Sequence, residues 1–144
     1  MSNWTHVAGV IRVDSLRFNE DIDFDKLIGK EFMPYKNILD NDSIEDTIAK
    51  LNEAYADLEA DSSAYLPMGS EGSLHKSVWT NPDECACAAY VVTIWGDLRD
   101  HHDANEIVEW FKKICDKLWV RQACITVENE RNGTVNWAYE EERR

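Results

Sequence analysis

Residues 85–118, CACAAYVVTIWGDLRDHHDANEIVEWFKKICDKL, place an apolar strand shortly before an amphipathic helix, and this pair decides the fold class. The first part, residues 85–95, is apolar at nearly every position, which is typical of a strand inside a sheet. In residues 103–118 the apolar side chains return every three or four positions, which predicts a helix. Asp103 can cap this helix, with Glu106 three positions later. The stretch therefore predicts an α+β protein.

Strands are also predicted on both sides of this pair. Residues 73–80 precede Asn81-Pro82-Asp83-Glu84, a turn sequence with Pro at its second position, and should pair with the apolar strand as an antiparallel hairpin. Residues 119–130 and 134–140 form a second predicted hairpin, because Asn132-Gly133 strongly favours a two-residue turn.

The N-terminal half adds a strand at residues 4–13, a loop with a short helical turn at residues 14–41, and a helix at residues 43–59 capped by Ser43. The predicted order is strand, helix, strand, strand, helix, strand, with one extra C-terminal hairpin strand. This is the order of a ferredoxin-like sandwich, in which two helices cover one face of an antiparallel sheet. We expect one α+β domain over residues 1–144. The alternative is another α+β order, in which residues 14–41 add a strand.

Composition limits the possible partners. The 144 residues include 28 acidic and 15 basic side chains, which gives a net charge of −13 and a sequence that should repel phosphate backbones. General nucleic-acid binding is therefore not expected. No apolar run is long enough to span a bilayer and no leader pattern follows Met1, so we expect a cytoplasmic protein with reduced cysteines.

The face of the sheet turned away from the helices is the first candidate site. A two-residue turn at Asn132-Gly133 would pair Glu128 with Trp137. Strand alternation then collects aromatic and charged side chains on this face: Trp4, His6, Arg12, His75, Trp79, Glu128, Glu130, Trp137 and Tyr139. Aromatic residues among charges are typical of an interface. The alternative is that residues 14–41 cover the face as a lid.

Two loops are weaker candidates. The loop before the second helix contains Asp97, Asp100, His101 and Asp103, whose side chains are ligand types for a divalent cation. Its alternative is a polar loop in which Asp103 only caps the helix. Residues 68–73 (MGSEGS) could present backbone amides to an anion, or could simply form a tight turn. No cofactor is predicted.

Four stretches resemble a family of small uncharacterised proteins encoded by phages and prophages of Gram-positive bacteria. They are residues 4–12 (WTHVAGVIR), 66–74 (LPMGSEGSL), 95–101 (WGDLRDH) and 126–130 (TVENE). The resemblance implies a protein made in the cytoplasm of an infected host. Small acidic phage proteins often act by binding host proteins, including those of defence systems.

These observations lead to three hypotheses. The first is a non-enzymatic binding protein that uses the aromatic and acidic sheet face against a host protein or against itself, as a homodimer that Trp137→Glu would disrupt. The second is a small-ligand protein in which His6, Arg12, His75 and the aromatic rings hold a nucleotide-like molecule. The third is a metal-dependent enzyme centred on the Asp/His loop.

Overall fold

The computed structural model describes residues 2–16, 22–81, 87–101 and 103–140. The chain divides into two compact units. The sheet unit contains Met1–Asp23 and Pro67–Arg144, and the helical unit contains Phe24–Leu66. Of the predicted turn before the apolar strand, residues 82–84 lie outside the described residues, as does Cys85.

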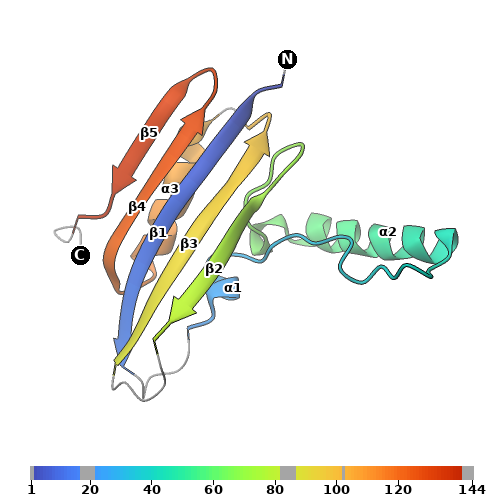
Figure 1. The fold of residues 1–144 in the computed structure, drawn as a ribbon, viewed down its shortest axis with the longest axis horizontal. Coiled ribbons are helices and arrows are strands. Elements are labelled where there is room, and N and C mark those ends of the chain that lie inside the picture. Colours follow the sequence, from blue (N-terminus) through green and yellow to red (C-terminus); the bar gives the residue numbers. More distant parts are fainter. Residues whose placement is uncertain (1, 17–21, 82–86, 102, 141–144) are drawn as a thin grey trace. The chain divides into compact units, whose positions relative to one another are not determined.

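The sheet unit is built on a five-stranded sheet of order β2-β3-β1-β4-β5, shown in Figure 1. Its strands are β1 (Trp4–Leu16), β2 (Leu74–Thr80), β3 (Cys87–Arg99), β4 (Val120–Asn129) and β5 (Gly133–Ala138). All four neighbouring pairs are antiparallel, so the predicted antiparallel α+β architecture and the β2–β3 hairpin are confirmed.

Helix α3 (Ala104–Asp116) covers one face of this sheet and lies behind β1 and β4 in Figure 1. The Asp103 side chain accepts hydrogen bonds from the backbone amides of Asn105 and Glu106, which confirms the predicted cap. Phe111 is fully buried against Gly9, where a Cβ would lie only 3.2 Å from the ring. The core behind the sheet includes Val7, Ile11, Val92, Ile94, Leu98, Ile107, Ile114, Ile125 and Val127.

The helical unit contains α1 (Phe24–Leu27), α2 (Ile44–Ala60) and the short 3-10 helix η1 (Ser62–Ala64). Ser43 caps α2 by accepting a hydrogen bond of 3.1 Å from the amide of Asp46. The Phe32 ring packs edge-on against Tyr55 and Tyr65. No residue of α2 is buried, and Ile44 is 80% exposed. Thus α2 has the predicted amphipathic pattern, but its apolar stripe is not part of a core.

The finer prediction of a ferredoxin-like sandwich stays a prediction, because it requires α2 to pack on the sheet beside α3.

Among the described residues, no helix is long and apolar enough to cross a membrane.

The predicted pairing of the last hairpin is wrong. Glu128 pairs with Thr134, and Trp137 pairs with the buried Ile125. The reason is a longer turn, because the side-chain oxygen of Asn129 accepts hydrogen bonds of 3.0 Å from the amides of Arg131 and Asn132. These contacts close a three-residue loop between Asn129 and Gly133.

A shift of three positions in this pairing exchanges the faces of β5, because side chains alternate along a strand. Trp137 therefore lies on the side of α3, where its ring contacts Phe111 at a centroid distance of 5.8 Å. Tyr139 follows on the same side, 6.4 Å from the Trp137 ring. Neither residue belongs to the face away from the helix, so both are removed from the candidate site, and Trp137→Glu would perturb packing against α3.

Candidate functional site

The sheet face turned away from α3 carries exposed aromatic and charged side chains, and we call it the open face. Seven of the nine predicted residues lie on it or at its edge: Trp4, His6, Arg12, His75, Trp79, Glu128 and Glu130. Strand pairing adds Trp95 and Asp97 from β3, which stand beside Ala8 and His6 of β1. Trp79 and Trp95 are 57% and 44% exposed.

One end of the open face is acidic. His6 Nδ1 lies 2.6 Å from a carboxylate oxygen of Asp97 on β3, and Glu128 stands beside His6 on β4. His6 Nε2 lies 3.9 Å from Glu130. The hydrogen bond to Asp97, with the negative charges of Asp97, Glu130 and Glu128, raises the pKa of His6 despite its partial burial. We call these four residues the acidic end.

The turn at residues 68–73 supports the acidic end through contacts with β3. The amide of Ser70 donates to the carbonyl of Arg99, and the amide of Arg99 donates to the carbonyl of Glu71. The Arg99 guanidinium also pairs with the Glu71 carboxylate at 2.6 Å. Gly72 has a φ of 74° and passes close to the backbone of Asp97, where a Cβ would collide. The turn therefore braces β3 next to Asp97.

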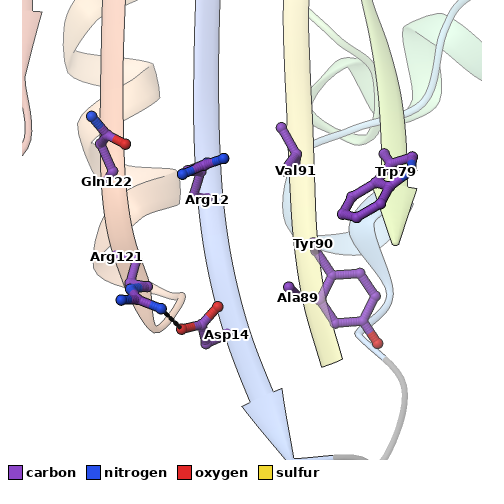
Figure 2. A pocket seen from close by; sticks show the side chains of 8 residues that line it. All are labelled: Arg12, Asp14, Trp79, Ala89, Tyr90, Val91, Arg121 and Gln122. Atoms are coloured by element: carbon purple, nitrogen blue, oxygen red, sulfur yellow. Dashed lines mark hydrogen bonds and ion pairs between the residues drawn. The ribbon is translucent and has the colours of Figure 1, made fainter. Parts of the chain in front are cut away.

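The opposite end of the open face is basic and forms a shallow depression of about 550 Å³, shown in Figure 2. Strand pairing places Gln122, Arg12, Val91 and Trp79 in one row across β4, β1, β3 and β2. Two strand spacings separate Arg12 from Trp79, which is about 10 Å. Val91 lies between them as the floor of the depression (Figure 2).

Arg121 reaches this depression because of a β-bulge. The pairing of β1 with β4 shifts between Arg12 and Val13, which leaves Arg121 as the extra residue of β4. Its guanidinium pairs with Asp14 at 3.0 Å (Figure 2). Asp14 is thus engaged by Arg121. Arg12 makes no side-chain hydrogen bond or ion pair within the described part of the chain. We call Arg12 and Arg121 the basic end.

Small side chains fill the middle of the open face. Ala8 and Val10 of β1 stand between Thr93 and Trp95 on β3 and Cys124 and Thr126 on β4. The Trp95 ring lies 5.7 Å from the ring of His75 on β2. The middle is therefore flat, weakly polar and bordered by the two exposed tryptophans on the side of β2 and β3.

The predicted metal site is not assembled. Among the residues described here, no group of three His, Cys, Asp or Glu side chains could hold a metal ion. Asp97 pairs with His6, and Asp103 caps α3. Asp100 has a φ of 59° and accepts a 2.9 Å hydrogen bond from the Ser70 hydroxyl. Each of these three side chains therefore has its own separate structural contact.

His101 contributes mainly through its backbone. Its carbonyl accepts hydrogen bonds from the hydroxyl of Thr5 and the side-chain amide of Asn129, both of which are buried. The loop is thus tied to β1 and β4 by a polar contact below the acidic end.

Sequence reasoning missed Trp95, Asp97 and Arg121 as members of the open face. The alternation along residues 91–99 carries the signal for the first two, because Val91, Trp95 and Asp97 share one parity. Nothing in the sequence marks the bulge that redirects Arg121.

Comparison of the chain with protein-family models, with curated proteins and with solved structures finds no match.

Proposed function

We propose that this protein acts by binding another protein through its open face and not by catalysis. The observation that carries the proposal is the pair of exposed tryptophans, Trp79 and Trp95, on neighbouring strands of the open face. Exposed aromatic side chains within a polar rim are typical of protein interfaces. The ferredoxin-like arrangement of α2 and α3 on the other face is part of the same proposal, since it would leave this face free.

The charges of the open face describe the partner that fits it. Arg12 and Arg121 form the basic end. The three carboxylates of the acidic end, which belong to Asp97, Glu128 and Glu130, lie about 20 Å away along β1. A partner needs a flat apolar centre with acidic groups at one side and basic groups at the other. The net charge of −13 disfavours an extended nucleic acid. The resemblance to phage proteins favours a host protein as such a partner, including one with a role in defence.

The proposal is tested by affinity capture from a Gram-positive bacterial lysate. Trp95→Glu should abolish the capture of any specific partner, because it places a charge in the apolar centre of the interface. The control is Tyr35→Glu, which changes a side chain of the helical unit that is 68% exposed and should leave capture unchanged. Equal capture by both variants, or no specific capture by the wild type together with a monomeric chain, would reject the proposal.

A nucleotide-like ligand is the second candidate, and the depression at the basic end is the observation that favours it. A phosphate could contact Arg12 while a base stacks on Trp79, since about 10 Å separates the two side chains. Calorimetric titration with nucleoside monophosphates tests this. Binding should be lost in Trp79→Ala and kept in Trp95→Ala. If neither the wild type nor Trp95→Ala shows a heat of binding, the nucleotide-like ligand is excluded.

A further inference from the structure

We infer that the protein bound by the open face is a second copy of this chain. The inference rests on the proposed function, that the open face is a protein-docking surface, and it names the occupant. Two copies would pack face to face about a two-fold axis that lies between the sheets and runs across the strands. Such an axis turns one copy end for end, so that the acidic end of each copy meets the basic end of the other.

The strand pairing gives the contacts of this arrangement. With the axis at the level of Gly9, Arg12 of one copy faces the level of His6 in the other. There Glu128 and Asp97 stand on either side of His6, on β4 and β3. Arg12, which has no partner of its own among the described side chains, would gain two carboxylates. Arg121 would approach Glu128 and Glu130.

The shape of the open face suits a second sheet. Packed sheets lie about 10 Å apart, which requires small side chains where the strands cross. Ala8, Val10 and Cys124 occupy the middle of the face, and Trp79 and Trp95 lie to one side of it. Five strands about 4.8 Å apart and about 25 Å long offer on the order of 600 Å² per copy. The total, on the order of 1,200 Å², reaches the lower limit of specific interfaces.

Charge selects this arrangement over the other two-fold packing. An axis parallel to the strands and over β1 would place Arg12 against Arg12 and Glu128 against Asp97, so like charges would meet at both ends. Each chain also carries a net charge of −13. The repulsion this causes is screened beyond about 10 Å at 0.1 M salt, so it does not prevent close contact at the ends.

A charge exchange tests the arrangement by light scattering at physiological ionic strength. The wild type should be a dimer. Arg12→Glu should raise the dissociation constant of the dimer at least about tenfold, because the introduced carboxylate would face Glu128, and Glu128→Arg should do the same. An equimolar mixture of the two variants should regain most of the wild-type mass, because one end of the mixed dimer keeps Arg12 against Glu128 and the other end places the introduced glutamate against the introduced arginine. Lys113→Glu on α3 is the matched control and should remain a dimer.

The outcomes separate this inference from the proposed function. A monomeric wild type that still captures a host protein, or binds a nucleoside monophosphate at Arg12, overturns the second copy as occupant. Single variants that dissociate but do not reassociate on mixing overturn the end-to-end arrangement. Both exchanged side chains are exposed, and circular dichroism verifies that the variants fold. Cross-linking of a cysteine at Ala8 with a short bismaleimide, in a Cys124→Ser background, gives an independent readout, since the two-fold axis brings both copies of this position close together.

Discussion

Alternate residues of the same strands make the two faces of the sheet, yet the faces have opposite characters. On the side of α3, Ile11 and Val92 are fully buried. On the open face, Trp95 is 44% exposed although it lies on the same strand as Val92. The side of α3 gains enough apolar burial to hold the sheet, whereas the exposed tryptophans contribute little to folding in a single chain. Their presence is better explained by contact with another molecule.

The largest predicted difference between the faces is in thiol reactivity. Burial raises the pKa of Cys115 on α3 to about 12, with a further contribution from Asp116. Cys124 on the open face is exposed. In dilute, monomeric protein, alkylation of Cys115 should therefore require unfolding and be on the order of 1,000-fold slower than that of Cys124. Peptide mass spectrometry after timed treatment with iodoacetamide measures both rates. Similar rates would show that α3 does not seal this face.

The next effect is the removal of a ring from the core. Phe111→Ala should lower the free energy of unfolding by about 3–5 kcal/mol, because it leaves a cavity under Gly9. Trp95→Ala is the control on the open face and should cost about 1 kcal/mol or less, since its side chain is only partly buried and its removal leaves no enclosed cavity. Urea unfolding monitored by circular dichroism compares the two. A larger loss for Trp95→Ala would mean that the open face is itself part of a core.

A smaller effect is expected from the residue that sets the last hairpin. Asn129 is 1% exposed, and its side chain joins Thr5 on β1 to the amides of the β4–β5 turn. Asn129→Ala should cost about 1–3 kcal/mol, because buried polar groups lose their partners. Asn136→Ala removes a 2.7 Å hydrogen bond with Thr126 on the exposed side and should cost at most about 0.5 kcal/mol. Equal losses in urea unfolding would contradict the role given to Asn129.

The sequence predicts most of the sheet because its inner strands obey simple alternation. Residues 4–13 and 85–95 alternate or remain apolar, and Arg12 follows onto the open face from that pattern, as Trp79 does from residues 73–80. The predicted pairing of the last hairpin is wrong because Asn132-Gly133 favours a two-residue turn. Instead, the buried Asn129 side chain accepts hydrogen bonds from two amides and closes a longer loop. The sequence does contain a pattern that favours the observed pairing, since matching apolar with apolar side chains on the two strands places Trp137 beside Ile125.

The helices show a different limit of prediction. Both α2 and α3 carry an apolar stripe, but only α3 buries it. Periodicity states which side of a helix is apolar and not what covers that side, so the exposure of Ile44 cannot be derived from it. Arg121 is unpredictable for a related reason, since the bulge that redirects it depends on the pairing of β4 with β1.

The smallest effect concerns pH and the acidic end. Asp97 holds the proton of His6 by a hydrogen bond, and Glu128 and Glu130 of β4 add negative charge, so the folded pKa lies above the ordinary value of 6.5. The folded chain thus binds this proton more tightly than the unfolded chain. The resulting stability is complete below pH 6.5 and is lost as pH rises through the folded pKa. The contribution is small because the side chains of His6 and Asp97 are 43% and 61% exposed to screening solvent.

Urea unfolding of dilute protein between about pH 5.5 and 8.5 measures this contribution. The free energy of unfolding of the wild type should exceed that of His6→Gln at low pH, and the difference should shrink as pH rises. His75→Gln, on the same face beside Trp95, is the control and should follow the wild type. An advantage that grows with pH would mean that the carboxylates do not retain the proton on His6.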